Sequence, residues 1–166
     1  DLHEDFVPML VANHLFGTGG TGRLWLRIRE KDGLSYDARS GVSWNSFEPN
    51  SRWIASAIFA PQNQPKVEAA FREELARSLK DGFSQQELDE ARTGLLSSRR
   101  LARAQDGVVT GALGENLYLG RSFARSQQVD DAIAKLTLAQ VNAAWRKYID
   151  PTRVVFAWAG DFKQNP

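Results

Sequence analysis

The chain has 166 residues and a mass of 18.5 kDa, the size of one ordinary domain. Its 21 Lys and Arg residues against 20 Asp and Glu residues give a net charge of +1, which argues against a generally basic nucleic-acid or membrane-surface binder. The composition, 42% hydrophobic and 25% charged, is that of a folded globular protein; no apolar run is long enough to span a membrane, and no cysteine is present to form disulfides or thiolate zinc sites.

The first part of the chain alternates helix signals with glycine. Asp1 and Glu4 have the spacing of a capping box, and apolar residues follow at helical spacing until Gly17. Residues 17–22 form a glycine-rich loop, and a second short helix is expected to end at Gly33. Because the sequence opens without Met and without a signal-like segment, we expect it to be part of a longer chain.

The next two segments, residues 36–45 and 53–59, predict a β-hairpin. Apolar and polar residues alternate over 36–45, which predicts a strand with one buried face. After a turn at 47–51, residues 53–59 are apolar on both faces and predict an interior strand. The residues expected to share the buried face of the first strand are Tyr36, Ala38, Ser40, Val42 and Trp44.

The second half of the sequence is mainly helical in pattern. A helix is expected from Pro65 to Gly82, and a capping box of Ser84 and Glu87 opens another helix to about Arg103. Further helices are expected over 105–119, in spite of three glycines, and from a cap at Thr137 with Gln140 to Asp150, whereas residues 153–160 predict a buried closing strand. This order indicates an α+β fold with two layers, a mostly antiparallel β-sheet and helices packed on one face.

The sequence does not indicate a metal site or a Ser-His-Asp triad that lies entirely within this chain. His3 and His14 are the only histidines, and on one helix they would lie about 16 Å apart, too far to share an ion. The H-x-x-E-H and H-E-x-x-H motifs are both missing, so no metal site is expected in this domain. The two histidines also make a Ser-His-Asp arrangement improbable.

The glycine loop and a basic stripe each allow more than one interpretation. Phosphate-binding loops follow a strand, whereas residues 17–22 follow a helix, so a mobile connector is favoured; Gly19 and Gly20 would touch a peptide if a cleft lies beside them. The basic stripe, a row of arginines, has three interpretations: a nucleic-acid surface, a peptide-binding wall or a solvated helix face. The net charge of +1 favours the solvated helix face. Its members are Arg92, Arg99, Arg100, Arg103, Arg121 and Arg125.

The segment from Arg29 to Tyr36 is the most informative. Gly33 breaks the chain between a short helix and a strand, so that a guanidinium and a phenol can meet at one corner. Both groups donate hydrogen bonds suited to a substrate carbonyl or a developing oxyanion. From chemistry alone, a structural ion pair for Arg29 and a packed strand-end position for Tyr36 stay open.

The sequence resembles the non-catalytic half of the pitrilysin/insulinase-type zinc metallopeptidases, the inverted zincins that include mitochondrial processing peptidase. The resemblance extends over almost the whole chain, and its most specific part is residues 22–36. The matching segments are Met9-Leu-Val-Ala-Asn-His-Leu-Phe-Gly17, Gly22-Arg-Leu, Arg29-Glu-Lys-Asp-Gly-Leu-Ser-Tyr36, Glu73-Glu-Leu, Ser84-Gln-Gln-Glu-Leu-Asp-Glu-Ala-Arg92, Leu117-Tyr-Leu-Gly120 and Arg153-Val-Val-Phe-Ala-Trp-Ala-Gly-Asp161.

The resemblance implies a LuxS/processing-peptidase-like half-domain over residues 1–166, which pairs with a zinc-bearing half in the same chain or in a partner subunit. It further implies that Arg29 and Tyr36 hold the substrate carbonyl and help to stabilise the tetrahedral intermediate. The expected partners are that second half and a peptide substrate, with zinc in the partner half, no cofactor in this domain, and neither nucleic acid nor a membrane span.

The main alternative is a degenerate half-domain that acts only as a structural or protein-binding scaffold, in which Arg29 and Tyr36 are incidental. A nucleotide or nucleic-acid role ranks third. The resemblance and the lack of cysteine are compatible with a bacterial periplasmic or cell-envelope location, which is the favoured expectation.

Overall fold

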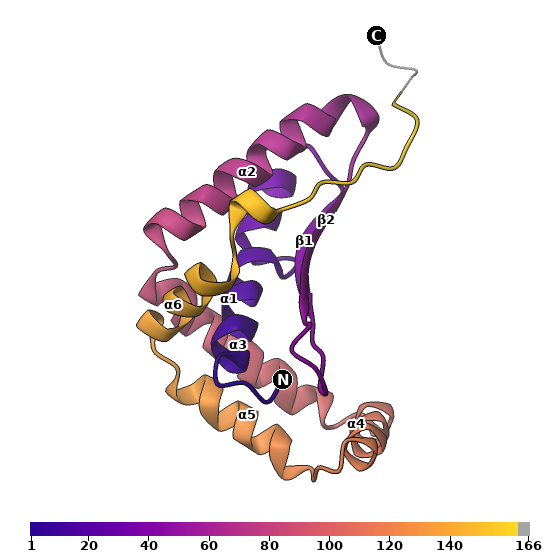
Figure 1. Cartoon of the computed structure of the whole chain (residues 1–166), viewed down its shortest axis with the longest axis vertical. Helices are drawn as coiled ribbons and strands as arrows, with labels where there is room; N and C mark the ends of the chain where they lie inside the picture. Colours follow the sequence, from indigo (N-terminus) through magenta and orange to yellow (C-terminus); the bar gives the residue numbers. More distant parts are fainter. Residues whose placement is uncertain (163–166) are drawn as a thin grey trace.

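A computed structural model describes residues 1–162 of the chain, and most of them are helical (Figure 1). One π-helix (η1) and two short 3₁₀ helices (η2, η3) accompany six α-helices and two strands in this part of the chain. The elements run in the order α1 (Phe6–Gly17), η1 (Trp25–Lys31), β1 (Asp37–Ser43), β2 (Arg52–Ile58), η2 (Pro61–Asn63), α2 (Gln64–Asp81), α3 (Gln85–Ala102), α4 (Asp106–Tyr118), α5 (Ala124–Lys135), α6 (Leu138–Tyr148) and η3 (Pro151–Arg153).

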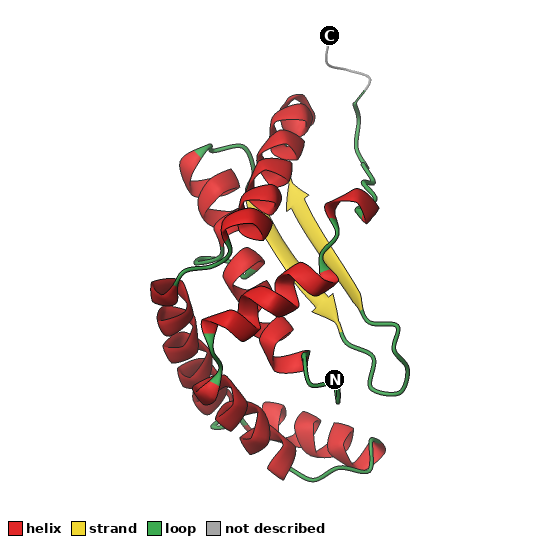
Figure 2. Cartoon of the chain, turned by 60° about the vertical axis from the view of Figure 1, so that its left-hand side comes forward, coloured by secondary structure: helices red, strands yellow, loops and turns green. Residues whose placement is uncertain are grey.

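The two strands form an antiparallel hairpin, with Asp37 opposite Ile58 at one end and Ser43 opposite Arg52 at the other. The helices lie on one side of this hairpin (Figures 1 and 2), and the outward residues Ile54 and Ile58 of β2 are exposed. The α+β class is therefore confirmed. The sheet is antiparallel, as expected, but the expected full sheet layer is wrong for residues 1–162, because the sheet has two strands and helices make up most of these residues.

The predicted closing strand over 153–160 does not form. After η3 the chain is extended, with Val154 and Phe156 half-buried and Val155 exposed, but among the described residues its backbone groups make no hydrogen bond to other backbone groups. The segment is apolar on both faces, as in a buried strand, yet a strand also needs a hydrogen-bonding neighbour. A groove separates this segment from β2, so the segment packs by its side chains alone.

Two further differences concern helices. No element was predicted between 119 and 137, yet α5 forms there and buries Val129 and Ile133 at helical spacing. The first helix starts at Phe6 rather than after a cap at Asp1, because the carboxylate of Asp1 pairs instead with the guanidinium of Arg121. In both cases, contacts with distant parts of the chain decide the local structure.

The remaining helices follow the sequence signals. Two of the three predicted capping boxes are present: Ser84 with Glu87 opens α3, and Thr137 with Gln140 opens α6. Helix α4 forms within the predicted range 105–119, although none of its residues is buried. No helix of residues 1–162 combines the length and the apolar character that a bilayer span requires.

The core centres on Trp145 of α6, whose side chain is completely buried. Its ring lies 4.9 Å from that of Phe16 in α1 and 5.9 Å from that of Trp53 in β2, measured between centroids. The indole N–H donates a 2.9 Å hydrogen bond to the hydroxyl of Ser78, which is also completely buried. This aromatic cluster joins α1, α2, β2 and α6 into one unit, which holds the hairpin against the helices.

The end of α1 approaches β1 so closely that only glycine fits at position 17. A Cβ atom on Gly17 would lie 2.0 Å from Oγ and 2.5 Å from the backbone nitrogen of Ser40. We therefore expect Gly17→Ala to lower the free energy of unfolding by about 1–3 kcal/mol, the usual cost of overpacking. Urea unfolding measures this change. Gly114→Ala in α4 is the matched control, because it meets open space and is expected to cause no loss.

A charge cluster fixes η1 to the start of α3. Arg23 donates a 2.7 Å hydrogen bond to Glu87 Oε1 and another, of 2.9 Å, to the carbonyl of Gly82. Burial of the Glu87 carboxyl disfavours its ionised form, but the hydrogen bonds from Arg23 and Ser84 outweigh burial and lower its pKa to about 2. The carboxylate of Glu87 therefore stabilises the folded state.

Because the pKa of Glu87 is lowered, the free energy of unfolding depends on pH in the acidic range. The contribution is complete above the ordinary pKa of 4.5 and is lost as the pH falls from 4.5 toward 2. We expect the free energy of unfolding to fall less steeply over this window in Glu87→Gln than in the unaltered protein, as measured by urea titrations at several pH values. Glu90→Gln, on the exposed side of α3, is expected to keep the original slope; equal slopes for all three proteins would contradict the prediction.

Candidate functional site at the corner of η1 and β1

Arg29 and Tyr36 meet at the corner where η1 leads into the sheet. Arg29 lies in the last turn of η1, and Tyr36 directly precedes β1. The guanidinium carbon of Arg29 lies 5.7 Å from the ring centroid of Tyr36. The sequence-based expectation that these two groups reach one corner is confirmed by this distance.

The turn between the two residues explains how the chain brings them together. Gly33 adopts a φ of 61°, in the left-handed region that glycine enters readily, and its N–H donates to the carbonyl of Arg29 at 3.2 Å. The buried hydroxyl of Ser35 then lies 2.7 Å from the carbonyl oxygen of Ile58, and the N–H of Tyr36 donates to the same carbonyl at 3.0 Å. The end of β2 thus holds the backbone of Tyr36 in place.

Tyr36 does not occupy the buried face that the alternating pattern predicted for it. Its side chain is 79% exposed, whereas Ala38, the next residue of that face, is 1% exposed. The reason is that Tyr36 precedes the first paired residue, Asp37, so that the alternation of the strand does not govern it. The phenol is therefore available to a ligand rather than packed at the strand end.

Arg29 differs from the other half-buried arginines because its donors are unused. In residues 1–162 its guanidinium makes no hydrogen bond, and its nearest carboxylate, Glu30, stands 3.6 Å away. At this distance the two partly exposed side chains form an ion pair without a hydrogen bond, a contact that contributes little to stability. All the other half-buried arginines of this part donate at least one side-chain hydrogen bond, namely Arg23, Arg27, Arg92, Arg99, Arg103, Arg121 and Arg125.

Trp25 and the glycine loop adjoin this corner. The guanidinium carbon of Arg29 lies over the ring of Trp25 at 4.1 Å from its centroid, the geometry of a cation–π contact. A Cβ atom on Gly19 would lie 3.9 Å from Cε3 of Trp25, so the loop passes beside the indole. Gly20 adopts a φ of 90° with open space around it. The sequence analysis did not select Trp25, although its spacing of four residues from Arg29 signals a shared helix face.

Most arginines of the basic stripe form hydrogen bonds or ion pairs with other residues of the domain. Arg99 and Arg103 pair with Asp130 of α5; burial opposes ionisation of this carboxyl, but the two arginines outweigh burial and lower its pKa. Arg92 donates to the carbonyl of Leu136 at 2.7 Å, and Arg121 and Arg125 bind Asp1. Arg100 stays exposed. The stripe therefore joins helices, which is a structural role.

The described residues do not fit a zinc site. One group of three potential ligands, His3, Glu4 and Asp5, occurs in residues 1–162, on an exposed turn before α1. Nδ1 of His3 accepts a hydrogen bond from the N–H of Asp5, and the Asp5 carboxylate is held by Lys147 and Tyr148 at 2.6 and 2.8 Å. His14 is half-buried in α1, where burial lowers its pKa.

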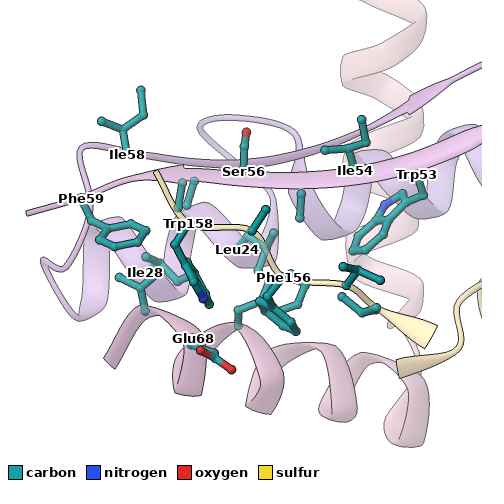
Figure 3. Close-up of a pocket in the computed structure, with 18 of the residues that line it drawn as sticks. Leu24, Ile28, Trp53, Ile54, Ser56, Ile58, Phe59, Glu68, Phe156 and Trp158 are labelled. Carbon is teal, nitrogen blue, oxygen red and sulfur yellow. The ribbon is translucent and has the colours of Figure 1, made fainter. Parts of the chain in front are cut away.

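A separate apolar groove of about 1020 Å³ lies between β2, α2 and residues 154–160 (Figure 3). Trp53, Phe59, Phe156 and Trp158 point into it, whereas Ile54, Ser56 and Ile58 point away. The carboxylate of Glu68 in α2 lies at the edge of the groove. Neither Arg29 nor Tyr36 lines the groove, so it is distinct from the corner that carries the hydrogen-bond donors.

The fold and the corner together define a class of protein: an α+β domain in which Arg29 and Tyr36 lie together at one corner, with no zinc ligand set among the described residues that is free of other contacts. The family model described as the peptidase M16 inactive domain matches residues 1–95, which is more than half of the chain. The chain therefore belongs to the peptidase M16 inactive-domain family.

Individual relatives agree with this assignment. The non-peptidase homolog YmxG of Helicobacter pylori is 24% identical over 166 residues, which cover 99% of this chain and 38% of that protein. The crystal structure of a peptidase M16 inactive domain from Pseudomonas fluorescens matches with a TM-score of 0.79 and 25% identity, over 90% of this chain and 35% of that one. The chain thus spans little more than a third of these relatives.

A shorter structural relative has a similar fold. The inactive peptidase domain of a putative zinc protease from Bordetella parapertussis matches with a TM-score of 0.69 and 22% identity. The match covers 87% of this chain and 77% of that one. At this identity the likeness concerns the fold alone.

Proposed function

We propose that this domain is the inactive half of a bipartite zinc metallopeptidase, in which it closes the substrate chamber and supplies Arg29 and Tyr36 to the peptide. Zinc and its ligands belong to a second half, in the same polypeptide or in a partner subunit. Membership of the inactive-domain family supports the first part of the proposal. The unused donors of Arg29 support the second.

The single observation that carries the proposal is the state of Arg29. The guanidinium of Arg29 is half-buried and makes no hydrogen bond in residues 1–162, and it lies beside the exposed phenol of Tyr36. Hydrogen-bond donors such as these stabilise the negative charge that develops on a carbonyl oxygen when water attacks a peptide bond. The zinc of the other half polarises the water and the carbonyl when it is bound.

Reconstitution tests the proposal. The zinc-bearing half of the same protein is assayed on a mixture of fluorogenic peptides, alone and after addition of this domain. We expect cleavage to rise with added domain until the two are equimolar, and Arg29→Ala added in the same amount to restore far less. Equal cleavage with and without the domain would overturn the proposal.

The second candidate is a scaffold without chemistry. The description of the Helicobacter pylori relative as a non-peptidase homolog favours it. An H-x-x-E-H motif in the rest of the polypeptide or in a neighbouring gene, together with bound zinc in the purified complex, decides for the peptidase half. A complex that assembles with this domain but holds no zinc and cleaves no peptide decides for the scaffold.

A further inference from the structure

We propose that Trp25 is a positioning residue that holds the guanidinium of Arg29 ready for the substrate carbonyl. This inference rests on the proposed function, because it assigns to Trp25 an effect on the reaction that acts through Arg29. Neither the family match nor the relatives assign any role to this tryptophan.

The geometry identifies Trp25 as the main restraint on Arg29. The guanidinium carbon lies 4.1 Å from the centroid of Trp25 but 5.7 Å from that of Tyr36, and Glu30 is beyond hydrogen-bond distance. A cation above an aromatic face is attracted by the ring quadrupole, and this contact uses none of the N–H groups in a hydrogen bond. Trp25 therefore fixes Arg29 and leaves its donors available.

Trp25 is itself held firmly enough to serve this purpose. It is half-buried at the start of η1, between Leu24 and Ile28, which are each 1% exposed and anchor the helix in the core. The glycine loop passes along its six-membered ring at Gly19. The indole thus lies beside the loop and against Arg29, on a helix that Leu24 and Ile28 anchor in the core.

Loss of the ring is expected to free Arg29 without unfolding the domain. With leucine at position 25 the guanidinium samples several rotamers, and we expect kcat of the assembled peptidase to fall by about 10- to 100-fold, the size of effect that a misplaced catalytic group causes. Trp25→Phe keeps an aromatic face and is expected to retain most of the activity. Trp158→Leu, at a tryptophan away from the corner, is the matched control.

A double-mutant cycle on the complex with the zinc-bearing half tests the inference. If Trp25 acts through Arg29, Trp25→Leu lowers kcat in the unaltered protein but has no further effect in an Arg29→Ala background. An equal fall in both backgrounds would overturn the positioning role and leave the proposed function standing. An Arg29→Ala protein with full activity would overturn both.

A second measurement does not depend on activity. The Cδ protons of Arg29, observed by NMR in this chain alone, are expected to be shifted upfield by the ring current of Trp25. The shift should persist in Trp25→Phe at reduced size and vanish in Trp25→Leu. Unshifted Cδ protons in the unaltered chain would show that the stack is absent and end the inference, whatever the activity.

Discussion

Under the proposed function, we expect Tyr36→Phe to lower kcat of the complex with the zinc-bearing half by about 10²- to 10³-fold, the loss that follows removal of one oxyanion donor. The substitution deletes a single hydroxyl from a side chain that is 79% exposed, so the fold is expected to keep its stability. Because the donor is needed when charge develops on the carbonyl oxygen, KM changes far less than kcat. Steady-state kinetics and thermal unfolding of the same preparations measure both effects.

Tyr118→Phe is the matched control for this prediction. Tyr118 ends α4 and is 78% exposed, and its ring packs edge-to-face on Phe47, away from the corner. Removal of its hydroxyl is expected to leave kcat unchanged. Full activity in Tyr36→Phe would remove the phenol from the catalytic role, and equal losses in both variants would indicate a general effect on folding or assembly.

Trp145→Ala is expected to cause the largest loss of stability, about 3–5 kcal/mol in the free energy of unfolding. The substitution opens a cavity among Phe16, Trp53 and Phe83, whose ring centroids lie 4.9 to 5.9 Å from that of Trp145. It also removes the indole N–H that binds the buried hydroxyl of Ser78. Chemical denaturation followed by circular dichroism measures the loss.

Trp158→Ala is the control, because it removes the same kind of side chain from a position that is 41% exposed. The comparison shows how much of the loss at Trp145 is due to burial. We expect Trp158→Ala to cost much less than Trp145→Ala, because the ring of Trp158 contacts Phe59 and Phe156 at the side of an open groove. Comparable losses at the two positions would mean that the core does not centre on α6.

The sequence predicted those elements whose signals are local. The capping boxes at Ser84 and Thr137 locate the starts of α3 and α6, because their partners lie three residues away. The corner was also predictable, since Gly33 lies between Arg29 and Tyr36 and allows the reversal that brings them together. For such features, short-range hydrogen bonds and backbone freedom are sufficient.

Features that depend on distant contacts could not be predicted in this way. The closing segment around Phe156 is apolar on both faces, as in a buried strand, but the pattern cannot reveal whether a neighbouring strand lies within hydrogen-bond distance. Helix α5 carries few apolar residues, and the pairing of Asp130 with Arg99 and Arg103 helps to fix it against α3. The stack of Arg29 on Trp25 likewise depends on the geometry of the π-helix, which the sequence pattern does not reveal.

The wide turn of η1 has a consequence for how this site can change by insertion or deletion. A π-helix accommodates an extra residue in its turn compared with an α-helix, in which each residue advances by about 100°. Removing one residue between Trp25 and Arg29 would close this wide turn to an α-helical one, in which residues three apart still lie on the same face. The extra residue of η1 could therefore be lost without moving the guanidinium to the opposite side of the helix.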